Sequence, residues 1–334
     1  MEEKGVKFHP ESALTKDDSG GPPRCPAHRF AQRVKFSDLS RDYLERLVRD
    51  ARNEDLAGLG LDTPPRASGD VTSKLLTPGL GGEATLVARE SLIACGIPLI
   101  PIILQAYHEE LSFQPEVEDG DRVGSGQSLG KASGPAPELL MSERVILNFL
   151  QFLSGVATLT RSYIDVLGPS TTRLLDTRKT IPGYRMLQKY AVACGGGWNH
   201  RLGLFDRVML KDNHLAANSA LSDQALTELV GKARRRNPEL LIELEVDDLA
   251  QIPAALDAAP DKLMLDNFTI PQLKRAVALI GRRVCTEATG GVTLDNLTEY
   301  GSIGLDFIST GALVHKAVWK DIGLDWNSGA SPDW

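Results

Sequence analysis

Residues 241–266 read LIELEVDDLAQIPAALDAAPDKLMLD, and this stretch decides the fold class. Two short apolar runs, Leu241–Val246 and Lys262–Leu265, are separated by a segment with helical spacing. Glu245 lies near the end of the first run, and Asp266 directly follows the second. Strands that alternate with helices form parallel sheets. The stretch therefore predicts a strand–helix–strand unit with acidic residues at one edge of a parallel sheet.

The same pattern extends in both directions along the chain. Further apolar runs are Arg173–Thr177 before Arg178, Arg207–Leu210 before Lys211, Val284–Thr286 before Glu287, and Phe307–Ile308 before Ser309. Helical patterns at 222–236 and 271–279 fill gaps between them. Polar residues at the carboxyl ends of strands are typical of an α/β barrel, whose active site forms there. The pattern favours a barrel, and an open doubly wound sheet is the alternative.

The chain before residue 150 has a mixed pattern. We expect a strand at Ala84–Arg89, a helix at Cys95–Leu111, and short strands joined by glycine turns at Val117–Ala132. From Ser142 onward, apolar side chains recur at helical spacing and predict a long helix. The sequence therefore indicates an α/β fold with a second, smaller domain in front of the barrel.

Four segments are expected along the chain. Residues 1–34 contain glycine, proline and aspartate without periodicity, which predicts a mobile extension. Residues 35–149 are assigned to the N-terminal domain and residues 150–326 to the barrel domain. The C-terminal part of the barrel domain is expected to pack back on the N-terminal domain. Residues 327–334 form a tail.

Composition narrows the class of protein. The formal net charge of −7 argues against nucleic acid as a partner. No uninterrupted apolar run is long enough to cross a bilayer, so a membrane is not expected as a partner. Glu2, Glu3 and Lys4 stand where a signal peptide needs apolar residues, so we expect a cytoplasmic location. The four cysteines lack paired spacing, which favours free thiols in a reducing compartment.

Four cations follow or lie near predicted strand ends. Arg178 and Lys179 follow one strand, Arg201 follows His200, and Lys211 ends the next strand. Converging cations repel one another and lose hydration, so their grouping is explained best by a polyanionic substrate. Arginine pairs bidentately with carboxylates, and lysine supplies a point charge for phosphate. The alternative is that each cation pairs with a nearby acid.

Carboxylates and glycines form the second candidate group. Glu245 and Asp266 can hold Mg²⁺ and sugar hydroxyls, because Mg²⁺ takes a few carboxylates together with substrate phosphates. Glu243 faces the same side as Glu245 by the two-residue period and is a further candidate. The loops Thr289-Gly290-Gly291 and Ser309-Thr310-Gly311 follow the last two strands. Late loops of barrels often bind phosphate through backbone N–H groups, and an ordinary turn is the alternative.

Several motifs together resemble one enzyme family. Asp176-Thr177-Arg178-Lys179-Thr180-Ile181-Pro182-Gly183 resembles the D-T-R-K-T-x-P-G motif of quinolinate phosphoribosyltransferases, also called nicotinate-nucleotide pyrophosphorylases. The other similar motifs are Gly69-Asp70-Val71-Thr72, Glu143-Arg144, Gly195-Gly196-Gly197-Trp198-Asn199-His200-Arg201, Leu210-Lys211-Asp212-Asn213-His214, and Leu265-Asp266-Asn267-Phe268. The resemblance covers roughly residues 37–326 in the same order.

The resemblance implies an N-terminal α/β sandwich domain followed by an incomplete α/β barrel, in a homodimer. It also implies transfer of phosphoribose from phosphoribosyl pyrophosphate to quinolinate, which gives nicotinate mononucleotide, pyrophosphate and CO₂ in NAD biosynthesis. The residues implied for quinolinate are Arg178, His200, Arg201 and Lys211, with Arg144 reaching in from the partner subunit. Those implied for phosphoribosyl pyrophosphate are Lys179, Glu245, Asp266, Thr289, Gly290 and Gly311. Lys179, Glu245 and Asp266 are the implied catalytic residues, and the last two the implied Mg²⁺ ligands.

The sequence departs from the family pattern at two places. The link from Leu56 to Ser68 is longer, and Thr289 stands where serine is common. Three other functions remain to be distinguished: a related pyrophosphorylase with a different anionic acceptor, a barrel aldolase that uses Lys179 or Lys211 as a Schiff base, and a non-catalytic anion-binding protein. His200 is a candidate for proton transfer, and positioning of the ring by hydrogen bonds is its alternative role.

Overall fold

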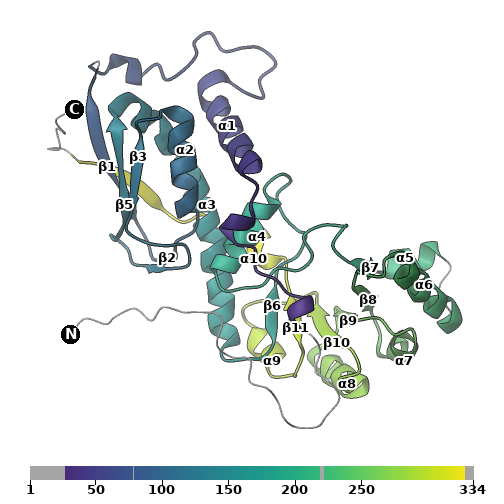
Figure 1. The fold of residues 1–334 in the computed structure, drawn as a ribbon. Coiled ribbons are helices and arrows are strands. Elements are labelled where there is room, and N and C mark those ends of the chain that lie inside the picture. Colours follow the sequence, from purple (N-terminus) through teal and green to yellow (C-terminus); the bar gives the residue numbers. More distant parts are fainter. Residues whose placement is uncertain (1–26, 78, 219–221, 328–334) are drawn as a thin grey trace, which may run out of the picture.

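The chain forms two layered parts joined by one long helix. We describe residues 27–77, 79–218 and 222–327 of a computed structural model. A four-stranded sheet and a six-stranded parallel sheet make up most of the strands, and a two-stranded ribbon adds β2 (Leu92–Ile93) and β4 (Arg122–Val123). Figure 1 shows the two larger sheets at opposite ends of α3 (Ala136–Leu167). The mixed α/β class predicted from the sequence is confirmed.

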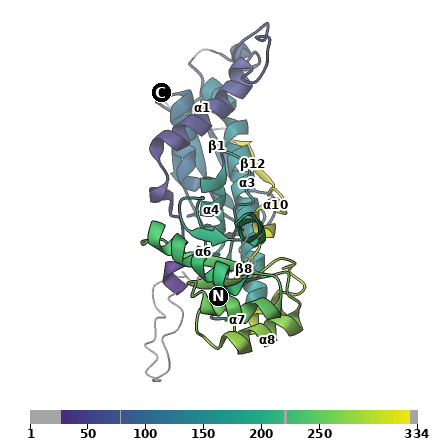
Figure 2. The same cartoon turned by 90° about the vertical axis from the view of Figure 1, so that its right-hand side faces the viewer.

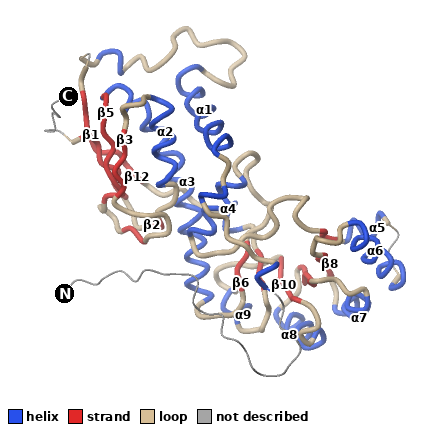
Figure 3. The backbone as a smooth tube through the Cα atoms, viewed as in Figure 1, coloured by secondary structure: helices blue, strands red, loops and turns tan. Residues whose placement is uncertain are grey.

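The N-terminal part is an antiparallel sheet covered by helices. The strand order is β12 (Ile322–Trp326), β1 (Gly81–Ala88), β5 (Ser128–Pro135), β3 (Ser112–Pro115). Along β1 buried and half-buried residues alternate, as expected for a strand with one face on a core. Helices α1 (Arg41–Ala57) and α2 (Ile100–Tyr107) lie beside this sheet, as Figure 3 shows. The end of the chain thus returns to the first sheet through the β12–β1 pairing.

Helix α3 connects the two parts along the length of the molecule (Figure 2). It begins at Ala136, six residues before the predicted start at Ser142, because Pro135 and Pro137 are compatible with a helix N-terminus. The proposed domain boundary at residues 149 and 150 therefore lies inside a continuous helix. This helix is long and apolar enough to cross a bilayer by length and composition alone. Since 67% of its most apolar window is buried inside the protein, it is explained as a core helix.

The second part is an incomplete barrel of parallel strands. The order is β6 (Arg173–Leu175), β11 (Phe307–Ser309), β10 (Cys285–Thr289), β9 (Lys262–Asp266), β8 (Ile242–Val246), β7 (Val208–Leu210). Strands β6 and β7 are the two edges, so the hydrogen-bonded ring stays open between them. The helices of this part are α4 (Arg185–Cys194), α5 (Asp212–Ala217), α6 (Asp223–Arg236), α7 (Ile252–Asp257), α8 (Ile270–Ile280), α9 (Leu297–Gly301) and α10 (Ala312–His315).

Residues 30–33, which the sequence assigned to a mobile extension, contact the barrel domain. Phe30 is fully buried, and its ring lies 6.0 Å from that of Phe307, which begins β11. Gln32 forms a β-bridge with Asn199, and the Arg33 side chain donates to the carbonyls of Gly196 and Gly197. An aromatic side chain buried at the amino end of the barrel strands explains why this segment is held in place. Residues 1–26 of the predicted extension lie outside the described residues.

The expectation of free thiols holds for two of the described cysteines and not for a third. Cys95 is a buried free thiol, and Cys194 is a half-buried one. Cys285, at the start of β10, is disulfide-bonded. The expectation of free thiols throughout is therefore wrong for Cys285, because cysteines far apart in sequence can still meet in the fold.

Candidate active site

One cavity of about 680 Å³ lies at the carboxyl ends of the barrel strands. Ten predicted site residues line it: Arg178, Lys179, His200, Arg201, Lys211, Glu245, Asp266, Thr289, Gly290 and Gly311. Eight of them come from the ends of six strands or the loops that follow, and His200 and Arg201 come from the loop after α4. Because parallel strands all end at the same edge, residues up to about 130 positions apart in the sequence meet here.

The loops after β6 and α4 are held in place by a buried carboxylate. Asp176 accepts hydrogen bonds from Lys189 Nζ at 2.6 Å and from the His200 backbone N–H at 2.8 Å. Asn199 Nδ2 donates to the second oxygen of Asp176 at 2.9 Å. All four residues are nearly inaccessible to solvent. The contacts fix the backbone that carries Arg178 on one side and Arg201 on the other.

Two arginines face the cavity without an acidic partner among the described residues. Arg201 is 8% exposed, and burial, with the nearby charge of Arg178, lowers the pKa of its guanidinium. The Nε atom of Arg178 is buried without a hydrogen-bond partner in the described part of the chain. Glu243 and Asp206 act on Arg201 as nearby charges. Two neighbouring cations at one wall still repel each other, and an anion bound between them would relieve this repulsion. The alternative that each cation pairs with a nearby acid therefore fails for these two arginines.

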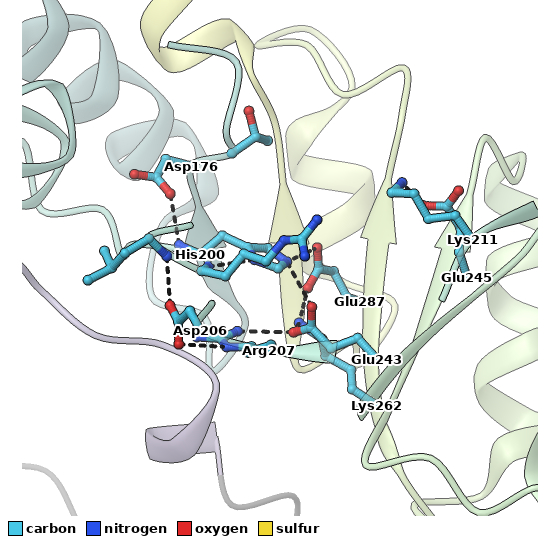
Figure 4. Close-up of polar contacts among 12 residues, drawn as sticks. Asp176, His200, Asp206, Arg207, Lys211, Glu243, Glu245, Lys262 and Glu287 are labelled. Carbon is cyan, nitrogen blue, oxygen red and sulfur yellow. Dashed lines mark hydrogen bonds and ion pairs between the residues drawn. The ribbon is translucent and has the colours of Figure 1, made fainter. Parts of the chain in front are cut away.

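Lys211, in contrast, does pair with a nearby acid. Its ammonium group forms an ion pair with Glu245 of the neighbouring strand β8 (Figure 4). Burial raises the pKa of Glu245, and Lys211 opposes this effect. A Schiff-base lysine must attack a carbonyl as the free amine, whereas Lys211 is engaged in an ion pair. The contact therefore weighs against Lys211 as the Schiff-base lysine of an aldolase.

Three carboxylates gather beside this ion pair. Oxygen atoms of Glu245, Asp247 and Asp266 lie within 4.8 Å of one another. Burial raises the pKa of Asp266, while Lys211 lowers it. Oxygen ligands at this spacing fit a hard divalent cation, and the exposed Asp247 leaves room for water and substrate ligands. The sequence analysis identified Glu245 and Asp266 for this role and did not single out Asp247.

Two glycines on the cavity wall leave little room for a side chain. Gly290 has φ of +83°, and a Cβ atom there would lie 2.2 Å from Asn267 Oδ1. A Cβ atom on Gly311 would lie 2.7 Å from Lys179 Cδ. The missing side chains bring backbone N–H groups close to the cavity, as phosphate-binding loops require.

Some predicted residues lie elsewhere. Glu243 shares the interior face of β8 with Glu245, but it is completely buried below the cavity and does not line it. Arg144 lies on α3 and is outside the cavity of its own chain. Its side chain is 58% exposed, and its ion pair with Glu143 spans 3.9 Å. The exposed guanidinium is free to contact another molecule.

Sequence reasoning missed several lining residues. Met209 and Met264 line the cavity on β7 and β9, and Asn267 holds Asp266 by a 2.7 Å hydrogen bond from Nδ2. Asn267 has φ of +54°, an unusual backbone conformation of the kind found at functional sites. Its place in the Leu-Asp-Asn-Phe motif was a usable signal. Lys316, on the same wall, had no sequence signal.

An incomplete α/β barrel with cations, carboxylates and glycine loops around one cavity defines a transferase for phosphorylated, anionic substrates. The comparisons specify this class further. Residues 70–154 match the model of the quinolinate phosphoribosyl transferase N-terminal domain, and residues 156–325 match that of its C-terminal domain. The chain belongs to the quinolinate phosphoribosyltransferase family, as the sequence motifs indicated.

Similarity over most of the chain indicates the same family. The chain is 39% identical over 272 residues to quinolinate phosphoribosyltransferase [decarboxylating] 1b of Nicotiana tabacum, covering 77% of each chain. It is 37% identical over 296 residues to the nicotinate-nucleotide pyrophosphorylase [carboxylating] of Mycobacterium leprae, covering 87% of this chain and 99% of that one. The solved nicotinate-nucleotide pyrophosphorylase from Francisella tularensis superposes with a TM-score of 0.80 at 32% identity, covering 89% and 100% of the two chains.

Proposed function

We propose that this chain transfers the phosphoribosyl group of phosphoribosyl pyrophosphate to the ring nitrogen of quinolinate. The products are nicotinate mononucleotide, pyrophosphate and CO₂, a step of NAD biosynthesis. The observation that carries the proposal is the division of one cavity into two chemical halves. Arginines without an acidic partner in the described ranges form one half, and carboxylates with glycine loops form the other.

The arginine half fits the two carboxylates of quinolinate. Arg178 and Arg201 supply guanidinium groups, which pair with carboxylates in a fork geometry. Lys211 adds a point charge once substrate competes with Glu245 for its ammonium group. His200 forms part of the same wall. A dicarboxylate satisfies more of these cations than a monocarboxylate, which favours quinolinate over nicotinate.

The other half fits phosphoribosyl pyrophosphate with Mg²⁺. Lys179 and the backbone around Thr289, Gly290 and Gly311 would contact phosphate. Glu245 and Asp266, with Asp247 beside them, would hold the cation. When bound, Mg²⁺ would neutralise charge on the leaving pyrophosphate. The Glu245 and Asp266 carboxylates also stabilise the ribose carbon as it becomes electron-poor.

The cavity residues account for both steps of the reaction, the transfer of the phosphoribosyl group and the loss of CO₂. The ring nitrogen attacks the anomeric carbon while the bond to pyrophosphate breaks, and the cavity walls hold the reactants in line. The carboxyl at ring position 2 then leaves as CO₂, and its bonding electrons remain on the ring carbon until a proton arrives. Arg178 and Arg201 lie where cations can stabilise that negative charge.

We also propose a homodimer in which Arg144 enters the cavity of the partner subunit. The support is its exposed guanidinium and its position outside its own cavity. Ile181, Leu204 and Phe205, in loops beside the cavity residues, are 48%, 71% and 75% exposed. A second copy that covers these apolar side chains would remove them from water.

A product assay tests the proposal directly. Purified protein is incubated with labelled quinolinate, phosphoribosyl pyrophosphate and Mg²⁺, and nicotinate mononucleotide, CO₂ and pyrophosphate are measured. We expect equal amounts of the three products, and no product when nicotinate replaces quinolinate. Binding of both substrates without nicotinate mononucleotide would contradict the function and favour a non-catalytic anion-binding protein.

A further inference from the structure

Both ring nitrogens of His200 face protein atoms. The backbone N–H of Arg201 donates to Nδ1 at 2.7 Å. The Nε2 atom is buried from solvent and faces Glu287 Oε1 at 3.3 Å and Glu243 Oε2 at 3.8 Å. His200 is 4% exposed, although it lines the substrate cavity. The imidazole therefore presents its carbon edge to the cavity, and its nitrogens contact protein atoms.

The hydrogen bond at Nδ1 determines where the proton is. A nitrogen that accepts a backbone N–H uses its lone pair and carries no hydrogen. The single proton of a neutral imidazole is then on Nε2, where the two carboxylates face it. A doubly protonated ring would set an Nδ1–H against the Arg201 N–H, which places two donors 2.7 Å apart. The geometry therefore favours the neutral Nε2–H tautomer.

The buried charges around the ring balance without it. The fully buried Glu243 and Glu287 supply two negative charges, and Lys262 and Arg207 supply two positive charges. At the edge of this group the half-buried Asp206, 3.9 Å from Arg207, adds one negative charge and Arg201 adds one positive charge. Lys262 Nζ lies 2.7 Å from Glu243 Oε1 and also pairs with Glu287, and Arg207 Nη1 lies 3.0 Å from Glu243 Oε1. Figure 4 shows this group apart from the Lys211–Glu245 pair. A charged imidazole would leave a net buried cation, which is costly.

Glu287 is the carboxylate best suited to hold the imidazole. It is completely buried on β10, and its second oxygen pairs with Lys262. Burial by itself would raise the pKa of Glu287, but Lys262 and the neighbouring His200 together more than offset this, and the pKa lies below its usual range. Its oxygen toward His200 is buried without a hydrogen-bond partner among the described residues, and so is His200 Nε2, 3.3 Å away, which leaves each atom as the available partner of the other.

We infer that Glu287 is a positioning residue for His200: backed by Lys262, it holds the imidazole as the neutral Nε2–H tautomer with that proton turned into the protein interior. His200 then shapes the quinolinate wall and does not exchange a proton with the substrate. The proton that replaces CO₂ must come from another group or from water. The expected effect on the KM for quinolinate rests on the proposed function, whereas the tautomer can be tested independently of it.

The tautomer can be measured without substrate. Protein with ¹⁵N-labelled histidine is examined by long-range ¹H–¹⁵N correlation spectra near neutral pH, and a His200→Asn protein identifies the His200 signals. We expect one Nε2–H tautomer with an unprotonated Nδ1. An Nδ1–H tautomer or a doubly protonated ring would overturn the inference, whatever the outcome of the product assay.

Two variants test the role of Glu287. In the double variant Lys262→Met with Glu287→Leu, the pair of charges is removed together, so the charge balance is kept. We expect this protein to lose the single tautomer and to show a KM for quinolinate raised on the order of 10-fold or more, since misplaced binding groups cost up to about 10²-fold. KM for phosphoribosyl pyrophosphate should stay near the wild-type value.

The Glu287→Gln variant should retain more of the wild-type behaviour, because the amide oxygen can still accept from Nε2. Glu90→Gln, at a surface ion pair with Lys320, is the matched control and should leave the spectrum and both KM values unchanged. If the folded double variant keeps either the wild-type His200 spectrum or the wild-type KM for quinolinate, Glu287 does not position His200.

Discussion

Lys211 and Glu245 form an ion pair across neighbouring strands at the mouth of the barrel. Lys211 ends up beside the acid because β7 and β8 are parallel and hydrogen-bonded, although 34 positions separate the two residues. Glu245 is 7% exposed at its side chain and Lys211 38% exposed. The pair joins the proposed quinolinate half of the cavity to the proposed phosphoribosyl half.

Replacing Lys211 by alanine should therefore impair both halves. It removes a cation for quinolinate and leaves Glu245 without its ion-pair partner. We expect kcat/KM for quinolinate to fall by about 10²- to 10³-fold, the usual cost of losing one electrostatic contact to the reacting groups. Steady-state rates of CO₂ release give the value. Lys274→Ala, at an exposed position on α8, is the control and should behave as wild type.

Mixing two inactive proteins should restore activity if Arg144 acts across a subunit interface. In a heterodimer of Arg144→Ala and Lys211→Ala chains, one cavity has Lys211 from one chain and Arg144 from the other. A symmetric dimer that exchanges subunits freely then recovers up to about a quarter of wild-type activity. The readout is the rate after subunit exchange. A verified heterodimer without activity would exclude the shared cavity.

Activity should depend on a divalent cation and be lost in acid. Burial raises the pKa values of Glu245 and Asp266, so these groups become protonated above the usual range for carboxyls as the pH falls. Protonation removes the charge that would hold Mg²⁺, so affinity should be full at neutral pH and fall through the raised pKa values. Calorimetric titration with Mg²⁺ across pH measures this, and Asp266→Asn should weaken binding at every pH. Undiminished activity in excess chelator would exclude the metal.

The Glu287→Gln variant should also be less stable than wild type. Lys262 would lose one of its two carboxylate partners in a fully buried position, and breaking such a pair costs about 3 kcal/mol. Because the folded-state pKa of Glu287 is lowered, the stability that it contributes is present above its unfolded pKa and is lost as pH falls toward the folded value. Urea unfolding at several pH values is the measurement. Glu90→Gln should cost at most about 1 kcal/mol.

Phe30→Ala tests the role of the segment before residue 35. Removing a fully buried ring at the amino end of the barrel should lower the free energy of unfolding by about 3 to 5 kcal/mol. Leu75→Ala is the control, because that side chain is 84% exposed and should change stability little. Both values come from denaturant titration. Equal stability of the two variants would show that Phe30 does not hold this segment against the barrel.

Much of the fold could be predicted because strands and helices have different apolar periods. The run Lys262–Leu265 lies within β9, and the helix expected at 222–236 is α6 with its cap at Ser222. The strand at Val284–Thr286 was predicted too short, since Glu287 was taken to follow it. A fully buried glutamate inside a strand has no local signal, because its partner Lys262 comes from the next strand.

By itself the sequence determined the strand–helix alternation and the chemical types at the strand ends. Both follow from local spacing, and Arg178, Lys211, Glu245 and Asp266 could be identified in this way. Tertiary structure alone decided which charges pair and which remain for substrate. Lys211 pairs with Glu245 while Arg178 and Arg201 do not pair with an acid in the described part of the chain. The reason is that ion pairing depends on distances between strands, and only the arrangement of the strands in the folded barrel sets them.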